Sequence, residues 1–300
     1  MTQPACIICK SGNMKLHFYP PNKFNNVTYN YYKCLQCNSL SIFPFPDKAS
    51  LKLMYNEDFH PYIDNFNKTE IATINNYRKN TSQRIQLDFI KELKQKTSGK
   101  KMLDFGCGGG IYMAVAETLG FETTGIEFDS DFTSYIRQKT KMNIFSFSEF
   151  EQQFTNQTFD IIHFGHNLEH LENPYAIFEQ LKKYTHANTL YVVDGPIENN
   201  NCLSRKIIDF VSILQKRKFN TNPPYHLSFT NYESQYLFFK KLNMKTLKYV
   251  AKEQYWPLPE KMEWEKPASI IKHLIARLSV FFSNIFKKQG NVFHYVGQLK

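Results

Sequence analysis

The stretch KMLDFGCGGG, residues Lys101–Gly110, decides the fold that we expect for this 300-residue chain. It reads as an apolar strand that runs into a glycine-rich turn, with a helical segment at 110–119. Glycines allow a sharp turn and close approach of a ligand, and a helix N-terminus attracts negative charge. Glu127 closes the next expected strand, where a carboxylate can accept hydrogen bonds from both ribose hydroxyls of an adenosine. These features predict an adenosine site at the switch point of a doubly wound sheet.

Two other nucleotide-binding motifs do not fit this turn. The dinucleotide fingerprint GxGxxG requires glycine at position 111, where Ile111 stands. No Lys-Ser or Lys-Thr follows the glycines, as a phosphate-binding P-loop requires. A dinucleotide-dependent oxidoreductase is therefore disfavoured.

Strands and helices alternate on either side of the turn, which implies right-handed βαβ units and a parallel sheet. The strands are expected at 101–105, 122–128, 143–147, 159–164 and 189–193, and the helices at 110–119, 130–140 and 174–185. Beyond residue 200 we expect helices at 200–218, 231–242 and 267–288, and strands at 244–252 and 291–299. Residues 48–98 have helical spacing of apolar positions.

The glycine turn resembles motif I of class I methyltransferases that depend on S-adenosylmethionine (SAM), in which an acidic residue precedes GxGxG. Four residues match that pattern: Asp104, Gly106, Gly108 and Gly110. Glu127 resembles the ribose-binding acid of the family, and residues 159–174 resemble its fourth strand and the loop that follows. The resemblance implies a Rossmann-like seven-stranded α/β sheet, SAM as cofactor, and a role for Asp104 in orienting the loop and the SAM amino group.

The resemblance covers roughly residues 100–250, with 291–300 similar to the family's last strand. The third motif departs from the family, because Phe145–Ser148 reads FSFS where an Asp is common. The contact to adenine is therefore open.

Cysteines form a second motif near the N-terminus. Cys6 and Cys9 make one CxxC pair and Cys34 and Cys37 another, with 24 residues between the pairs. Two such turns supply four thiolates, the tetrahedral set that Zn²⁺ prefers and one that leaves no open position for catalysis. We therefore expect a structural zinc ribbon. A zinc ribbon joined to this fold is similar to bacterial methyltransferases of sugar, polysaccharide or secondary-metabolite pathways.

The sequence divides into three expected parts. These are a zinc ribbon at 1–46, a helical linker or cap at 47–99, and a methyltransferase domain at 100–300 with an amphipathic helical insertion at 267–288.

The candidates for proton chemistry are His166, Glu169 and His170, which follow the fourth strand, and His226 in the segment PPYH at 223–226. His170 is the first candidate general base and His166 the second; we also place His166 among the cofactor-binding residues. A structural role for His170, holding its loop by hydrogen bonds, is the alternative. A metal cluster of these histidines with Glu169 is disfavoured, because His163 and His166 should point to opposite faces of their strand.

Positive charge collects in the last third of the chain. Residues 201–300 hold 17 Lys and Arg and 6 Asp and Glu, a net charge of +11. An anionic substrate, a membrane surface or a nucleic acid would suit that charge; a lysine-rich composition would also explain it. The helix expected at 267–288 carries an apolar stripe, which either packs on the protein or on a second subunit, or lies in a membrane interface.

Together these features predict a SAM-dependent methyltransferase that acts on a small-molecule, glycan or lipid-linked acceptor. The alternatives are a nucleic-acid methyltransferase, with the ribbon and basic third as docking surface, and a SAM-binding module without catalysis. No secretory signal or spanning segment is expected, so we predict a cytoplasmic protein, with a location peripheral to the inner face of the membrane as an alternative. The sequence does not identify the acceptor atom, the base or the oligomeric state.

Overall fold

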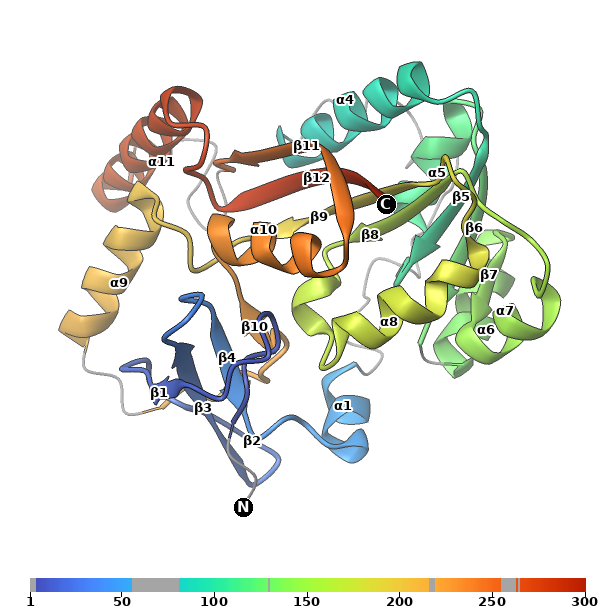
Figure 1. Ribbon diagram of the computed structural model, residues 1–300. Helices are drawn as coiled ribbons and strands as arrows, with labels where there is room; N and C mark the ends of the chain where they lie inside the picture. The colour runs from blue at the N-terminus through green and yellow to red at the C-terminus, as the bar shows by residue number, and fades with distance from the viewer. Residues whose placement is uncertain (1–3, 56–80, 129, 216–218, 255–262, 264) are drawn as a thin grey trace. The chain divides into compact units, whose positions relative to one another are not determined.

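The computed structural model describes residues 4–55, 81–128, 130–215, 219–254, 263 and 265–300 (Figure 1). The chain divides into two compact units. Unit 1 comprises Met1–Tyr55, Leu168–Tyr175 and Asp194–His294, and unit 2 comprises Asn56–Asn167, Ala176–Val193 and Tyr295–Lys300. The division into parts at 46 and 99 remains a prediction.

A seven-stranded sheet has the order β11-β12-β9-β8-β5-β6-β7. Its strands are β5 Lys101–Phe105, β6 Glu122–Glu127, β7 Ile144–Ser146, β8 Ile161–Gly165, β9 Leu190–Pro196, β11 Met244–Lys252 and β12 Val292–Leu299. β5 pairs in parallel with both β6 and β8, and β6 pairs in parallel with β7. The chain thus winds outward from β5 in both directions, which confirms the doubly wound α/β fold. The switch point of such a sheet, where ligands bind, lies beyond the carboxyl end of β5.

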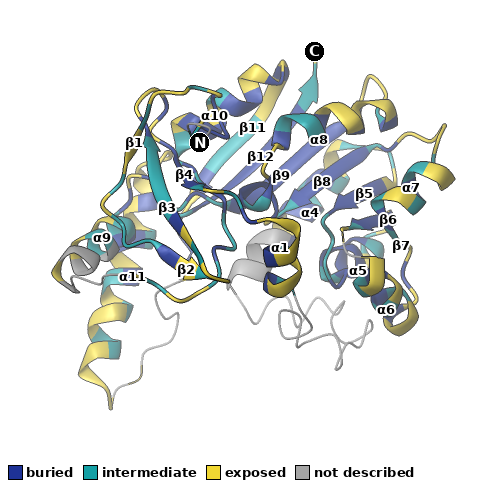
Figure 2. Ribbon diagram, turned by 90° about the horizontal axis from the view of Figure 1, so that it is seen from below, coloured by how far each residue is buried: buried dark blue, intermediate teal, exposed yellow. Residues whose placement is uncertain are grey.

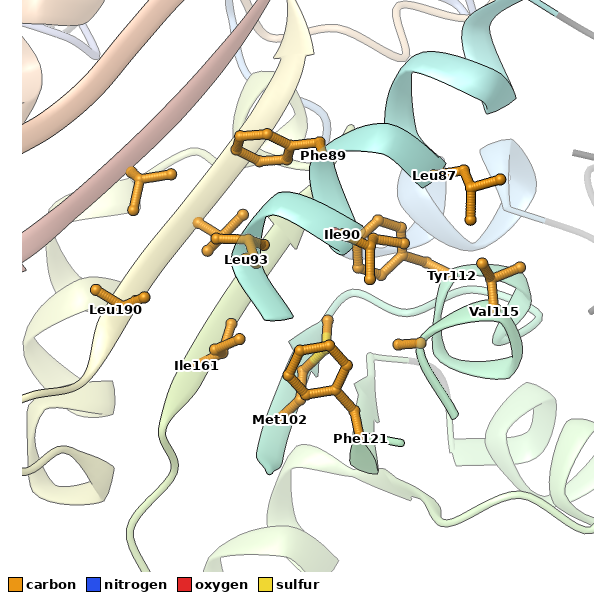
Figure 3. Packing of buried hydrophobic residues seen from close by; sticks show 13 residues of the cluster. Leu87, Phe89, Ile90, Leu93, Met102, Tyr112, Val115, Phe121, Ile161 and Leu190 are labelled. Carbon is orange, nitrogen blue, oxygen red and sulfur yellow. The ribbon is translucent and has the colours of Figure 1, made fainter. Parts of the chain in front are cut away.

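The helices of unit 2 pack their apolar sides against the sheet strands. They are α4 Thr81–Lys96, α5 Ile111–Thr118, α6 Ser130–Thr140, α7 Phe147–Gln153 and α8 Pro174–Leu181, with a short 3-10 turn at Lys182–Tyr184. Leu87, Ile90 and Leu93 of α4 meet Met102 of β5 and Ile161 of β8 in one buried cluster (Figure 3). Burial of such side chains stabilises the fold by about 1.5–3 kcal/mol each.

Unit 1 contains a small antiparallel sheet of order β1-β3-β4-β10, in which β2 also pairs with β3. Its strands are β1 Met14–Leu16, β2 Asn22–Phe24, β3 Val27–Cys34, β4 Leu40–Phe43 and β10 Ser228–Phe229. β10 comes from far along the sequence and pairs with β4 through Ser228 and Ser41. The expected ribbon at 1–46 is therefore completed by a strand that the local sequence pattern did not single out.

The remaining helices of unit 1 are α1 Lys48–Met54, α9 Leu203–Gln215, α10 Tyr232–Lys241 and α11 Pro267–Ile285, with a 3-10 turn at Leu168–His170. Asp47 begins α1, because its side chain accepts a hydrogen bond from the backbone N–H of Ser50. The helices expected at 200–218, 231–242 and 267–288 are confirmed with shorter bounds. The helical pattern expected at 48–98 is confirmed at α1 and α4, and its middle part, 56–80, lies outside the described residues.

No helix among the described residues combines the length and apolar character needed to cross a bilayer.

Candidate SAM site and associated centres

The glycine turn after β5 adopts a backbone that favours glycine. Gly106, Gly108 and Gly110 have φ values of 70°, 52° and 76°, all in the left-handed region. A side chain at Gly106 would place its Cβ 2.7 Å from Nδ2 of Asn167, and one at Gly110 would place it 2.8 Å from Sδ of Met142. The turn therefore requires glycine at these positions for backbone conformation, for space, or for both.

Glu127 at the end of β6 ties the turn to the neighbouring strand. Its Oε2 accepts a hydrogen bond from the backbone N–H of Gly108 at 2.9 Å, and its Oε1 accepts one from Phe128 at 2.7 Å. The carboxylate of Glu127 therefore holds the glycine turn at the end of β6.

Asp104 forms a buried pair that sequence reasoning missed. It is 2% exposed, and its Oδ1 lies 2.7 Å from Nδ1 of His163 on the adjacent strand β8. The ring of Tyr112 stacks on the His163 ring at a centroid distance of 3.8 Å. The strand register places Asp104 opposite His163, but register between non-consecutive strands could not be read from the chain alone. The pair fixes Asp104, and its Oδ2 has no hydrogen-bond partner within the described parts of the chain.

His166 and Asn167 follow β8 and differ in their exposure to solvent. Asn167 is buried and its Nδ2 donates to the carbonyl of Phe105, while its Oδ1 accepts no hydrogen bond from any described residue. His166 is exposed and has a φ of 51°. Asn167 therefore supports the glycine turn, a role that its position in the sequence did not indicate.

The residues around the glycine turn fit SAM by the chemistry of their polar atoms. The Oδ2 of Asp104 and the Oδ1 of Asn167 are buried acceptors, the kind of group that an ammonium requires. Glu127 places a carboxylate at the end of β6, the position from which an acid binds ribose hydroxyls in such sheets. Gly110 begins α5, whose N-terminus favours a carboxylate. The amino-acid and ribose parts of SAM thus each have matching groups in unit 2.

The departure from the family at Phe145–Ser148 has a local structural role. Ser146 is the N-cap of α7, and Glu149 completes a capping box by accepting a hydrogen bond from the Ser146 backbone N–H. Arg137 donates a hydrogen bond to Glu149 at 2.8 Å, which lowers the pKa of that carboxyl group. The serine in this motif therefore starts a helix; its relation to adenine remains a prediction.

A second polar centre lies in unit 1 around His170. Its Nδ1 lies 2.8 Å from the carbonyl oxygen of Tyr225 and 3.0 Å from the hydroxyl of Tyr55. Because a carbonyl only accepts, Nδ1 carries the proton and Nε2 keeps its lone pair. The Nε2 atom lies 3.8 Å from Oε1 of Glu169. His170 is thus oriented with a basic nitrogen available.

His226, a further candidate from the sequence, completes this centre. Its ring lies 4.8 Å from the His170 ring, and its Nδ1 lies 2.6 Å from Oε2 of Glu198. Burial lowers the pKa of His170. Burial is the largest single influence on His226 and acts to lower its pKa, but the hydrogen bond to Glu198 and the charges of Glu198 and Glu169 together outweigh it, so the pKa is raised. The two histidines therefore differ in proton affinity, which suits an acid–base pair.

Ligand atoms of Glu169, His170 and His226 lie within 4.8 Å of one another, so this centre has the donor types of a metal site as well.

The four cysteines of the two CxxC pairs gather in unit 1 as the sequence predicts. All are buried, and their sulfur atoms lie within 4.8 Å of one another. The sulfurs of Cys6 and Cys37 are 3.6 Å apart and those of Cys9 and Cys34 are 3.4 Å apart. A tetrahedral Zn²⁺ with bonds of about 2.3 Å separates its sulfurs by about 3.8 Å. The cluster therefore fits a zinc ion after small movements.

Helix α10 and the residue before it donate hydrogen bonds to the backbone of the two cysteine turns. Lys241 donates to the carbonyl oxygen of Cys9 at 2.7 Å, and Asn231 donates to that of Cys37 at 3.2 Å. The hydrogen bond from the Cys37 thiol lowers the pKa of Cys6, which favours the thiolate that a metal binds.

Residues 77–225 match the family described as a methyltransferase domain. This range spans the glycine turn, Glu127 and the strands that position them. The chain therefore contains a class I SAM-dependent methyltransferase domain.

Curated relatives of the chain share part of this domain. The ubiquinone biosynthesis O-methyltransferase of Actinobacillus pleuropneumoniae serotype 5b is 32% identical over 108 residues, 33% of this chain and 46% of the relative. The protein of the same name from Glaesserella parasuis serovar 5 gives the same values. The match thus spans less than half the length of these relatives.

Solved structures with similar folds are more distant in sequence. A SAM dependent methyltransferase from Archaeoglobus fulgidus is 15% identical with a TM-score of 0.43, covering 72% of this chain and 93% of its own. The plantazolicin methyltransferase BpumL in complex with a pentazolic desmethylPZN analog and SAH is 15% identical with a TM-score of 0.47, covering 84% and 95%.

Proposed function

We propose that the protein binds SAM at the glycine turn of unit 2 and transfers its methyl group to a small-molecule, glycan or lipid-linked acceptor. The observation that carries this proposal is the link between Gly108 and Glu127 at the switch point of the sheet. The fixed carboxylate of Asp104, with a buried oxygen free of hydrogen bonds, supports it. Bound SAM supplies a methyl group that its sulfonium already activates.

In this proposal each residue of the SAM site in unit 2 has a role in binding. Glu127 accepts hydrogen bonds from the ribose, Asp104 orients the turn and the amino group, and Gly106, Gly108 and Gly110 let the backbone approach the ligand. His166 is exposed beside Asn167 and is assigned to cofactor binding.

His170 is the proposed proton acceptor for the methyl acceptor. Its protonated Nδ1 leaves Nε2 basic, and burial keeps the ring neutral to lower pH than an ordinary imidazole. Glu169 would stabilise the imidazolium that forms when Nε2 takes a proton. The relatives named O-methyltransferases favour a hydroxyl acceptor, which must lose its proton during transfer.

The four-cysteine cluster is proposed to bind one structural zinc ion through Cys6, Cys9, Cys34 and Cys37. Sulfur spacing close to that of a tetrahedral site supports this role. Zinc would stabilise a sheet whose strands are short and whose apolar core is small.

The test is to follow isotope-labelled methyl groups from SAM. The full chain, with zinc bound, is incubated with labelled SAM and separate small-molecule, lipid and nucleic-acid fractions, and products are identified by mass spectrometry. Label in a small or lipid-linked product, absent with Gly108→Val, is the expected result. Label in nucleic acid would instead establish the nucleic-acid alternative, and SAM binding without labelled product would establish a non-catalytic module.

A further inference from the structure

Helix α11 buries its small side chains and exposes its large ones. The buried residues of α11 are Ala276, Ser279 and Ser283. The large apolar residues Ile271, Leu274, Leu278, Phe281 and Ile285 are each more than half exposed. Much of α11 carries the colour of exposed residues in Figure 2. An amphipathic helix that packs on its own protein does the reverse. The apolar stripe of α11 is therefore not used for packing on the described parts of this chain.

The five exposed residues form one continuous stripe, which we call the α11 apolar face. They recur at intervals of three and four residues, so they line one side of the helix, while Ala276, Ser279 and Ser283 line the other. The neighbouring helix α9, which contacts α11 (Figure 1), exposes Phe210 and Leu214 to a similar extent. Apolar side chains gathered in this way mark an interaction surface.

The charge around the α11 apolar face is positive. Residues 267–288 contain Lys272, Arg277, Lys287 and Lys288 and neither Asp nor Glu. By helical geometry, Arg277 borders the stripe, whereas Lys272 lies near the start of α11 on the side of Ala276, Ser279 and Ser283; both side chains are exposed. Neither forms an ion pair with an acidic group of the described residues, whereas the one acid of α9, Asp209, is paired with Arg205 at 2.9 Å.

We propose that the α11 apolar face docks on the surface of a bilayer that contains anionic lipid. Apolar side chains would enter the boundary between headgroups and acyl chains, Arg277 would contact the headgroups, and the charge of Lys272 would add to the attraction toward the anionic surface. A second copy of the chain fits this face less well, because it would bring two positive segments together. This inference goes beyond methyl transfer, and it brings the protein to a surface from which lipid-linked acceptors are accessible.

The test is co-sedimentation of the full chain with vesicles of phosphatidylcholine alone or mixed with phosphatidylserine. Binding to the mixed vesicles, weakened but not abolished by high salt, is expected. Phe281→Asp should release the protein. The matched control is Phe18→Asp, because Phe18 is 58% exposed and Phe281 57%; it should leave binding unchanged.

A second variant tests the charge. Lys272→Glu with Arg277→Glu should weaken binding at least about 30-fold, since each basic residue near an anionic surface contributes roughly fivefold. Lys48→Glu with Lys52→Glu, on the exposed side of α1, is the control. SAM affinity should not change in any of these variants, so failure here is separate from failure of the proposed function.

Three results would overturn the membrane proposal. The first is the absence of binding to either vesicle, and the second is equal binding by the Phe281 and Phe18 variants. The third is a wild-type dimer that Phe281→Asp converts to a folded monomer, which would assign the face to a second copy.

Discussion

Glu127 is the residue on which the cofactor assignment depends most directly. Glu127→Ala should weaken SAM binding about 10- to 150-fold, the loss of roughly 1.5–3 kcal/mol expected when a hydrogen bond to a charged group is removed. Glu127→Gln should lose less, because its amide oxygen can still accept from Gly108. Calorimetry measures both. Glu149→Ala is the control, since that carboxylate serves the cap of α7; an equal loss there would show a general effect on the fold.

His170 gives a prediction about pH. A proton acceptor must be neutral, and burial lowers the pKa of His170 from the ordinary 6.5. Activity should therefore persist below pH 6.5 and fall only as the pH drops through the lowered pKa of His170. His170→Gln should lower kcat and remove this acidic limb while SAM affinity is unchanged. A variant that keeps the wild-type pH profile would restrict His170 to a structural role.

Residues close in sequence were predictable, and partners from distant strands were not. The expected positions of Asp104, the glycines and Glu127 follow from one strand–turn–helix unit and the next strand, a local pattern. The contact of His163 with Asp104 was not predicted, because Asp104 lies on β5 and only the pairing of β5 with β8 brings the two residues together. His226 was a candidate from the sequence, but its position beside His170 was not predictable, because only the fold brings the two rings together.

At the scale of elements, the cysteine turns give a prediction about metal. The purified chain should carry about one zinc ion, and Cys34→Ser should lose it and unfold the small sheet of unit 1, because β3 ends at Cys34. SAM binding in unit 2 should survive. Elemental analysis and calorimetry on the full chain decide this. A second metal ion that persists in Cys34→Ser would point to Glu169, His170 and His226 as its ligands.

The cap of α7 gives a prediction about stability. Ser146→Ala removes the side-chain half of the capping box and should lower the free energy of unfolding by about 1 kcal/mol. Ser134→Ala is the matched control, because that exposed hydroxyl bonds only the carbonyl oxygen of Ser130 in its own helix. Denaturant unfolding of both variants provides the comparison, and equal midpoints would contradict the assigned role of Ser146.

Elements were predicted best where the chain repeats a local period. Alternating strands and helices from β5 to β9 matched expectation within a few residues, except α7, which was not expected. β10 has only two residues and joins a sheet built from the N-terminus, so no periodic signal marks it. The stripe of α11 was expected, but the sequence could not decide whether the protein covers it, because that depends on which face the neighbouring elements bury.

At the scale of the whole molecule, unit 1 combines residues from the start, middle and end of the chain, among them the cysteine cluster, the His170 centre and α11. A linear sequence pattern divides a chain into consecutive parts, so it could not anticipate this arrangement. The net charge of +11 was visible in the last 100 residues. This charge favours one kind of partner over the others only when the exposed apolar face of α11 is known.

Calorimetric titration of the full chain with SAM tests the central claim most directly. We expect one SAM per chain for the wild type and no measurable binding for Gly108→Val, because Gly108 has a φ of 52° that a β-branched residue does not tolerate and its N–H holds Glu127. Zinc content and circular dichroism of the variant should match the wild type. A wild-type protein that does not bind SAM, or a folded Gly108→Val variant that binds it equally well, would contradict the account.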